Sequence, residues 1–558
     1  MRGLMLVQAM LLLAAARPAR ADDIAPLIAQ SLSDPAPLTV DGTKLDVAAL
    51  RALYDTRSSA PLWVTAPDAN ARIDAIVEFL RQVDRDGLEP RAYRITLIEA
   101  RRGATDPLKR AELDMLLSEA VMRYGVHVRT GARRPRVPIP DIEPMVVDPD
   151  PVPIALDLAS APPIEIASRM QRLAPQTADY ATMRDLLARY REVAAHGGWP
   201  KVGEVPKLTP GAVDPSVRRV RERLLATGEL AADQVPTPAQ RDVYDKHLEA
   251  AVKTFQKHHG LTPDGTIGNK TRDAMNVSAA ERVEQIVANM ERLRWLPTDL
   301  GERYVWINIP EYRLRVEDRG TTTLEMPVIV GKPTWQTPVF SSQIRHLVFN
   351  PPWNVPPRIA AEELIPRAMA DEGYFAAQGI SWRGGTRVAS AGSGITDGGT
   401  VVTTPRRLRQ APGPKNPLGR VKFNMPNPFG VYLHDTPNKD KFRQTSRSLS
   451  HGCVRVGNAP ALAAALLGDM PEWDEGRRKS ALADWSTRNV NLRSPVPVHI
   501  VYATAWRDPD GTVQFREDIY DSDAELARDV SKPRSVRPPL VVAPAGEAAP
   551  APVGDAEL

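Results

Sequence analysis

The sequence predicts a multidomain α+β protein made of a helical scaffold, a small helical module and a β-rich domain. Three observations predict this class. The 558 residues exceed the length of one typical domain. Apolar residues recur at helical spacing through the first half, and short alternating β-runs begin near residue 304. The only cysteine lies in the β-rich part.

The N-terminus has the features of a removable secretion signal. Arg2 precedes an apolar run from Leu4 to Ala16, and Ala19 and Ala21 form a small-x-small cleavage site. The run is about 13 residues, shorter than the roughly 20 that a membrane-spanning helix needs. We therefore expect residues 1–21 to be removed and the mature protein to be exported to a bacterial periplasm, without stable membrane insertion.

The charge argues against a nucleic-acid-binding protein, and the cysteine content excludes an internal disulfide. The formal net charge is +4, and Arg2, Arg17 and Arg20 belong to the predicted signal, so the mature chain carries a charge near +1. This balance is not typical of nucleic-acid-binding proteins, and we expect no nucleic-acid partner. Because Cys453 is the only cysteine, it cannot form an internal disulfide. It is either a small buried hydrophobe or a reactive thiol.

Residues 22–203 are expected to form a helical scaffold domain. Apolar residues recur at helical spacing in two clear stripes, 73–83 and 113–124. Such stripes must pack on one another, because their exposure to water is unfavourable. The Pro-rich stretch from Pro135 to Pro163 is expected to run as an extended connection. We assign this domain a structural role without chemistry.

Residues 204–276 predict a separate small module. One helical stripe ends at Phe255, and a strong Pro-Asp-Gly turn follows at 263–265. The segment AVKTFQKHHGLTPDGTIGNKTRDAM resembles the three-helix peptidoglycan-binding module. Residue pairs typical of that family, such as Phe255-Gln256 and Asp264-Gly265, occur in the family's order, and the resemblance covers about 60 residues. The resemblance implies glycan binding, and a packed module kept for spacing remains the alternative. Residues 277–302 are expected to form a linker helix.

Residues 303–525 predict a mostly β domain. Val305, Ile307 and Ile309 alternate with polar or aromatic residues, and further short β-runs follow before a Gly-Lys-Pro turn. A segment at about 353–408 interrupts these runs with a helical piece and a Gly-rich stretch, and we interpret it as a lid over a site. The Pro- and Ala-rich residues 526–558 are expected to be a disordered tail.

The segment YLHDTPNKDKFRQTSRSLSHGCVRVGN concentrates the reactive residues. A thiol is a good nucleophile only as the thiolate, and its ordinary pKa of about 8.5 makes a neighbouring imidazole the usual activator near pH 7. His434 or His451 could serve as that base, and spacing alone does not choose between them. An inert core cysteine, a zinc site with Asp435 and a redox-sensing thiol are the alternatives. Metal-ligand spacings and a second cysteine are both missing from the sequence, so we expect no metal and no cofactor.

A family resemblance rests on this segment. His434, fifteen intervening residues and Ser450-His451-Gly452-Cys453 resemble the signature of YkuD-type L,D-transpeptidases. Further matches are VGKPTWQTPVF, NPPWNVPP and APGPKNPLGRVKFNMPNPFGVYLHDT. With the scaffold and the module, they resemble the large periplasmic members that carry a lid. Arg455 departs from relatives that have Asn at this position, and it adds a candidate for carboxylate binding.

The resemblance implies a role for each site residue. Cys453 would attack the carbonyl of the third residue of a tetrapeptide stem, release the terminal D-Ala and form a thioester. His434 would be the general base, with the backbone carbonyl of Asp435 as its partner. Backbone N–H groups of the turn at His451, Gly452 and Cys453 would stabilise the oxyanion. The expected substrate contacts are Arg455, Tyr432, Ser450 and, from the lid, Trp353.

The predicted reaction joins two stem peptides by a 3-3 cross-link, with a diaminopimelate amine as acceptor. Water as acceptor would make the protein a carboxypeptidase, and a protein lysine would make it an anchoring enzyme. A wall-binding scaffold without catalysis is the alternative from another class. Peptidoglycan synthases are conceivable partners, and the resemblance also implies that carbapenems acylate Cys453.

Overall fold

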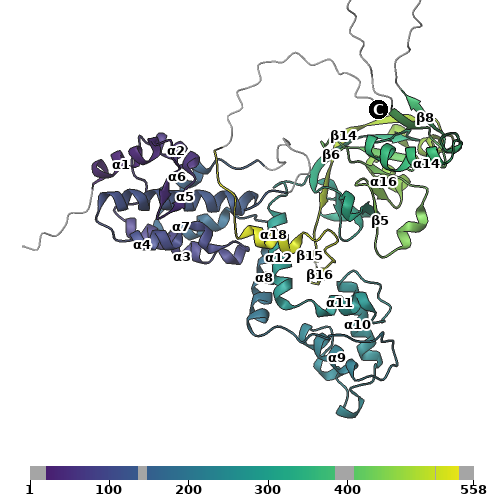
Figure 1. Ribbon diagram of the computed structural model, residues 1–558, viewed down its shortest axis with the longest axis horizontal. Coiled ribbons are helices and arrows are strands. Elements are labelled where there is room, and N and C mark those ends of the chain that lie inside the picture. Colours follow the sequence, from purple (N-terminus) through teal and green to yellow (C-terminus); the bar gives the residue numbers. More distant parts are fainter. Residues whose placement is uncertain (1–19, 136–146, 384–406, 509, 539–558) are drawn as a thin grey trace, which may run out of the picture.

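The computed structural model describes residues 20–135, 147–383, 407–508 and 510–538 (Figure 1). A helical body lies at one end, a β-rich domain at the other, and a small helical module hangs from the middle. The multidomain α+β class is therefore confirmed. Residues 1–19, which hold nearly all of the predicted signal, lie outside the described residues.

The helical body is built around one central helix. Helix α5 (Pro107–Thr130) is buried on almost every side, because neighbouring helices surround it. A small β1–β2 hairpin (Thr39–Val40, Thr43–Lys44) lies beside it. The surrounding helices are α1 (Ala21–Ser33), α2 (Val47–Asp55), α3 (Ala69–Arg81), α4 (Ile95–Arg101), α6 (Pro151–Ser160), α7 (Pro163–Arg172) and α8 (Ala178–Ala195).

The Pro-rich stretch of the body is not an extended connection throughout. Helices α6 and α7 both begin with proline in their first turn. Proline is favoured there, because its fixed φ suits the helix and its missing N–H would have no partner in the helix. The Asp150 side chain caps α6 by accepting a hydrogen bond from the Val152 amide at 3.0 Å. The prediction was wrong for 151–163, and residues 136–146 lie outside the described residues.

The small module contains three helices and has its own apolar core. These are α9 (Ser216–Thr227), α10 (Lys246–His258) and α11 (Asn269–Asn276). The buried Gln256 side chain fixes the turn between α10 and α11. Its Nε2 donates to the Thr266 carbonyl at 2.9 Å, and its Oε1 accepts from the Gly265 amide at 2.9 Å.

The predicted linker helix is α12 (Ala279–Leu293), which begins with a capping box between Ser278 and Glu281. It packs against α8 on one side and against α18 (Asp523–Val530) on another, so it belongs to the core of the helical body. The β15–β16 hairpin (Ala505–Arg507, Val513–Phe515) packs there as well.

The chain after α18 is ordered up to residue 538, so the predicted disordered tail was wrong for residues 526–538. The Arg534 guanidinium donates twice to the Asp148 carboxylate at 2.5 Å, and the Val536 amide donates to Asp46 at 3.0 Å. Val536 is only 2% exposed. Composition suggested disorder, but these residues gain buried partners in the helical body. Residues 539–558 lie outside the described residues.

The β-rich domain is one nine-stranded sheet in the order β12-β5-β13-β11-β10-β6-β14-β3-β4. Because β4 also pairs with β5, the sheet closes on itself around an apolar core, which α16 (Ala459–Leu466) and α17 (Glu475–Ala481) extend. The strands are β3 (Arg303–Asn308), β4 (Arg313–Asp318), β5 (Thr321–Gly331), β6 (Phe340–Phe349), β10 (Val421–Asn424), β11 (Leu433–His434), β12 (Ser448–Ser450), β13 (Val454–Val456) and β14 (Arg488–Val501).

The predicted lid is a compact insertion between β6 and β10 with a small core of its own. It comprises β7 (Trp353–Asn354), a helical run over α13 (Pro357–Ile359), 360–364 and α14 (Ile365–Ala370), then α15 (Tyr374–Gln378), β8 (Ile380–Arg383) and β9 (Arg407–Gln410). Strand β9 pairs with both β7 and β8. The Gly-rich residues 384–399 lie outside the described residues.

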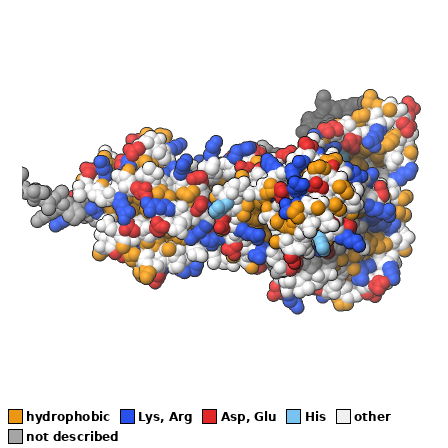
Figure 2. Space-filling model, turned by 90° about the horizontal axis from the view of Figure 1, so that it is seen from below, with side chains coloured by type: hydrophobic (Ala, Val, Ile, Leu, Met, Phe, Trp, Pro, Cys, Tyr) orange, Lys and Arg blue, Asp and Glu red, His pale blue; other side chains and the backbone are white. Residues whose placement is uncertain are grey.

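Basic and acidic side chains are interspersed on the face that Figure 2 presents. Within the described ranges, none of the helices has both the length and the apolar character that a membrane span requires.

Candidate active site

The strand register brings four predicted site residues to one face of the sheet. Strands β11 and β13 are parallel neighbours, with Leu433 opposite Val454. Both of these side chains are fully buried in the core of the sheet domain. Because successive side chains alternate between faces, the positions on either side point the other way. These positions are Tyr432, His434, Cys453 and Arg455.

His434 is held as a neutral imidazole. Its Nδ1 lies 2.5 Å from the backbone carbonyl of Asp435, to which the N–H donates. This bond leaves Nε2 as the nitrogen that can accept a proton. The side chain is 5% exposed. Burial and the nearby Arg455 charge lower the pKa of His434 to about 3, against the opposing effect of the Asp435 and Pro417 carbonyls.

The Asp435 carboxylate fixes the loop that precedes β10. It accepts from the Arg420 amide at 2.8 Å and from Lys439 Nζ at 2.5 Å. Gly419 has φ +61°, and a Cβ at this position would lie 2.5 Å from the Asp435 carboxylate. Only glycine both adopts this positive φ without strain and leaves room for the Asp435 carboxylate. No sequence pattern marked Gly419 beyond its place in the NPLGR segment.

The Ser450–Cys453 turn is closed by the Ser450 hydroxyl. The Ser450 Oγ donates to the Cys453 carbonyl at 2.6 Å and accepts from the Gly452 amide at 3.1 Å. Ser450 is 1% exposed, so the predicted substrate contact was wrong, and its side chain shapes the turn instead. The Gly452 N–H, which was predicted to stabilise an oxyanion, donates to Ser450 in this structure, and its role toward an oxyanion stays a prediction. Gly452 has φ +106°.

Thr337 holds the other side of this turn, and sequence reasoning missed it. The Thr337 hydroxyl donates to the Gly452 carbonyl at 2.8 Å and accepts from the Gly331 amide at 2.9 Å. The Thr337 amide donates to the Tyr520 hydroxyl at 3.1 Å, which in turn donates to the Gly331 carbonyl at 2.7 Å. The turn that carries Cys453 is thus connected to the segment just before α18.

The Cys453 thiol is half-buried in an electropositive setting. Burial raises its pKa above the ordinary value, and Tyr432, Lys422 and Arg455 act in the opposite direction. Tyr432 contributes both its backbone N–H and its hydroxyl. Lys422 Nζ lies 4.2 Å from the centre of the Tyr432 ring. The thiol is therefore protonated near pH 7, while the surrounding groups favour the thiolate once the proton leaves.

The Arg455 guanidinium lies close enough to the Cys453 sulfur for the two charges to interact. The Cys453 side chain raises the pKa of Arg455 while burial lowers it below the ordinary value. Within the described residues, the buried Arg455 Nε has no hydrogen-bond partner. A buried donor without a partner is rare in proteins. The unpaired Arg455 Nε is therefore an unusual feature of this site.

The lid contacts the site at two points. Trp353 forms a side-chain hydrogen bond to the Tyr432 hydroxyl. Glu363 Oε1 lies 2.5 Å from His451 Nε2, and the His451 ring packs edge-on against Trp335 at 4.9 Å. His451 is thus engaged with the lid, whereas His434 lies on the same face as Cys453. Across the described ranges, we find no group of three or more His, Cys, Asp and Glu side chains placed to hold a metal ion.

Three family models match this chain. Residues 302–498 match the "L,D-transpeptidase catalytic domain", residues 48–187 a "Scaffold domain", and residues 213–275 a "Putative peptidoglycan binding domain". A curated relative from Haemophilus influenzae, described as "Putative L,D-transpeptidase", is 37% identical over 249 residues, or 44% of this chain and 49% of the relative. The match thus spans about half the length of that relative.

Two solved structures are similar over part of the chain. An L,D-transpeptidase from Mycobacterium smegmatis has 16% identity and a TM-score of 0.19, covering 36% of this chain and 58% of that one. An L,D-transpeptidase from Stackebrandtia nassauensis has 14% identity and a TM-score of 0.20, covering 53% and 97%. On the family models, this chain contains a YkuD-type L,D-transpeptidase catalytic domain at residues 302–498, together with a scaffold domain and a peptidoglycan-binding domain.

Proposed function

We propose that this protein forms 3-3 peptidoglycan cross-links through a thioester on Cys453. The observation that carries the proposal is the shared face of Cys453 and His434, with the His434 ring oriented by the Asp435 carbonyl. A thiol paired with an oriented neutral imidazole is the arrangement that cysteine acyl-transfer requires.

Acylation begins with the neutral pair. His434 Nε2 takes the thiol proton as the Cys453 sulfur attacks the carbonyl of the third stem residue. The bond to the terminal D-Ala nitrogen breaks, and the imidazolium gives its proton to that leaving amine. The product is a thioester and free D-Ala. Lys422 and Arg455 lower the energy of the negative sulfur as it forms, because their charges favour the thiolate.

Transfer then regenerates the enzyme. The diaminopimelate amine of a second stem attacks the thioester carbonyl and loses a proton to His434. The C–S bond breaks, the sulfur recovers that proton, and a new amide joins the two third residues. Water in place of the amine would release a tripeptide, and a protein lysine would give an anchored protein. These outcomes differ in the acceptor alone.

Substrate recognition is proposed for the residues around the sulfur. The half-buried Arg455 guanidinium suits a stem carboxylate, because charge-assisted hydrogen bonds from arginine are strong and directional. Tyr432 and Trp353 form one wall, with Trp353 contributed by the lid. With the Gly452 amide occupied, we propose the Cys453 amide as an oxyanion donor.

The cellular setting is also a proposal. The peptidoglycan-binding domain supports a location at the cell wall. We propose export to the periplasm by residues 1–21, with stem peptides as the partners and peptidoglycan synthases as further candidates.

Mass spectrometry of the intact protein tests the reaction. After incubation with a disaccharide tetrapeptide, we expect an acyl adduct on the peptide that contains Cys453, and dimers among the soluble products. A carbapenem is expected to acylate the same residue. The Cys453→Ala variant should form neither adduct nor dimer, and His434→Ala should acylate about 10²- to 10⁴-fold more slowly. Wild-type dimer yield from Cys453→Ala would refute the proposal, and monomeric tripeptide as the main product would favour carboxypeptidase action.

A further inference from the structure

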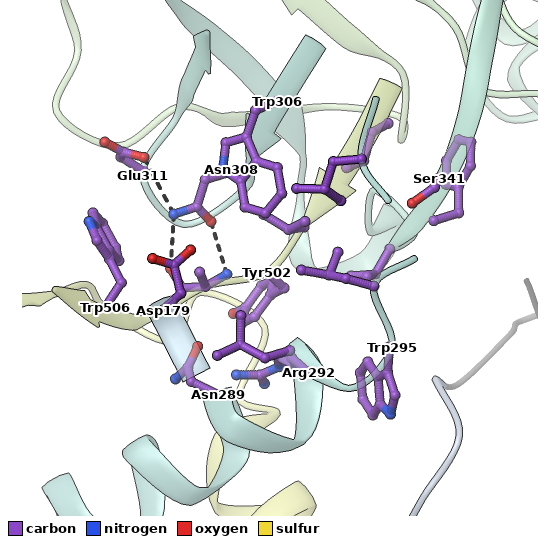
Figure 3. Close-up of a pocket in the computed structure, with 18 of the residues that line it drawn as sticks. Asp179, Asn289, Arg292, Trp295, Trp306, Asn308, Glu311, Ser341, Tyr502 and Trp506 are labelled. Atoms are coloured by element: carbon purple, nitrogen blue, oxygen red, sulfur yellow. Dashed lines mark hydrogen bonds between the residues drawn. The ribbon is translucent and has the colours of Figure 1, made fainter. Parts of the chain in front are cut away.

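A cavity lies away from Cys453, between the helical body and the sheet domain. It has a volume of about 620 Å³ and is lined by residues of α8, α12, β3, β4 and the β15–β16 hairpin. In Figure 3, Trp306 and Asn308 descend from one wall, Asn289 and Arg292 of α12 form the opposite side, and Trp506 stands at one end. Its size is within the range of about 300–1,000 Å³ typical of small-ligand sites.

The aromatic lining follows from the pattern of β3. Val305 and Ile307 are fully buried in the core of the sheet domain, so the alternate residues Tyr304 and Trp306 face the other way. An outward-facing strand position is usually polar when it meets water. Here both rings are only half-buried and line the cavity, and Trp306 lies opposite Arg315 of β4 in the strand register. The outer face of β3 therefore carries two aromatic rings, which lie edge to face with an angle of 69° between their planes.

The charges of the lining are balanced, and all but one of the charged side chains already have an ion pair or a hydrogen bond. Arg292 is ion-paired with Asp523 at 2.5 Å, and Arg315 with Glu311 at 2.5 Å. Asp179 differs. It is a solvent-exposed residue whose carboxylate has no hydrogen bond or ion pair within the described residues, and the loss of part of its hydration to nearby atoms raises its pKa above the ordinary value. The charged lining residues are Arg134, Arg292, Arg315, Arg507, Asp179, Glu311, Glu317 and Asp508.

These features select the ligand chemistry. An anionic ligand, such as a stem peptide, would meet paired arginines and the unpaired carboxylate of Asp179. A cation would be attracted to the aromatic faces and to Asp179, but the four arginines that line the same cavity would repel it. An uncharged ring with several hydroxyl groups suits both the aromatic rings and the carboxylate. Its apolar face covers an aromatic ring, and its hydroxyl groups donate to the carboxylate.

We propose that this cavity binds a peptide-free segment of an amino-sugar glycan strand. The Trp306 ring takes the flat face of a pyranose ring, the Tyr304 ring stands edge-on beside it, and Asp179 accepts a hydrogen bond from the hydroxyl groups of the sugar. The matched peptidoglycan-binding domain in the same chain makes a wall glycan the polymer at hand. The site is independent of the reaction at Cys453, so its failure would leave the proposed transpeptidation untouched.

Calorimetric titration of the full-length protein with chitotetraose tests the proposal. This probe is uncharged and carries no peptide. The Trp306→Leu variant keeps apolar bulk but loses the flat ring, and we expect binding at least about tenfold weaker, whereas Trp306→Phe should stay within about threefold of the wild type. Asp179→Asn should weaken binding about tenfold, because a charge-assisted hydrogen bond is lost. Asp55→Asn, an exposed change at the end of α2, is the matched control.

Each result decides the proposal. Thermal unfolding measurements check that each variant retains its fold. If Trp306→Leu fails to fold, the Asp179→Asn variant still tests the proposal. No binding by the wild-type protein would overturn the proposal. Binding that Trp306→Leu and Asp179→Asn leave unchanged would overturn it as well, because the tetrasaccharide would then occupy the small module instead.

Discussion

Replacing Thr337 by valine tests the idea that its hydroxyl holds the Cys453 turn in place. Valine keeps the volume and the branched shape, so the change removes little but the oxygen. The Gly331 amide and the Gly452 carbonyl would both lose a buried partner, since Thr337 is 2% exposed. At about 1–3 kcal/mol for each unpaired group, the folded turn would lose about 2–6 kcal/mol.

The consequence for catalysis is larger than the loss of two hydrogen bonds suggests. Gly452 immediately precedes the nucleophile, so a shift of the turn misplaces the sulfur, and a displacement of about 1 Å costs about 10²-fold in rate. We expect Thr337→Val to lower kcat for dimer formation by at least about tenfold with a smaller change in KM. The control Thr337→Ser retains the hydroxyl and should recover most of the activity. Wild-type kcat in Thr337→Val, together with an unchanged unfolding free energy, would refute the reasoning.

Three further predictions concern other parts of the molecule. Gly419→Ala should abolish most activity, because its Cβ would displace the Asp435 carboxylate at 2.5 Å; retained activity with an unmoved crystal structure would contradict this. Burial raises the pKa of Cys453, so iodoacetamide alkylation should still accelerate above pH 9, and Lys422→Met should move that profile to higher pH; a downward move would reject the role of the ammonium group. Arg534→Met should destabilise the helical body by about 1.5–3 kcal/mol in denaturant unfolding, because Asp148 loses its charge-assisted hydrogen bonds to Arg534 while it keeps those to Arg134 and Thr130, and a loss under about 0.5 kcal/mol would show that the ordered tail contributes little.

The motif around Cys453 could be predicted because its parts are close in sequence and the family pattern is specific. Alternation along two short runs then places Tyr432 and His434 beside Cys453 and Arg455, as the parallel register requires. The role of Ser450 was mistaken for a local reason. A serine next to a nucleophile can face the substrate or close the turn, and the hydrogen bonds that decide this are not encoded in spacing.

Partners that come from distant segments could not be predicted. Thr337 reaches Gly452 across 115 residues, and Glu363 reaches His451 across 88. Neither residue has a pattern of its own, because a lone threonine or glutamate is usually solvated. Arg534 finds Asp148 across 386 residues, within a tail whose composition indicates disorder. The cavity at Trp306 was missed for the same reason, since its walls come from separate elements.

The route of the chain through α12 and α18 determines when the helical body can be completed. Helix α12 is synthesised before the sheet domain, but the α18 surface that covers it comes more than two hundred residues later. The first part of the body therefore leaves the ribosome with one apolar face uncovered, and this face stays open while the whole sheet domain is made. A fragment that stops after residue 300 would retain that open face permanently, so the smallest stable helical unit has to include residues from both sides of the sheet domain.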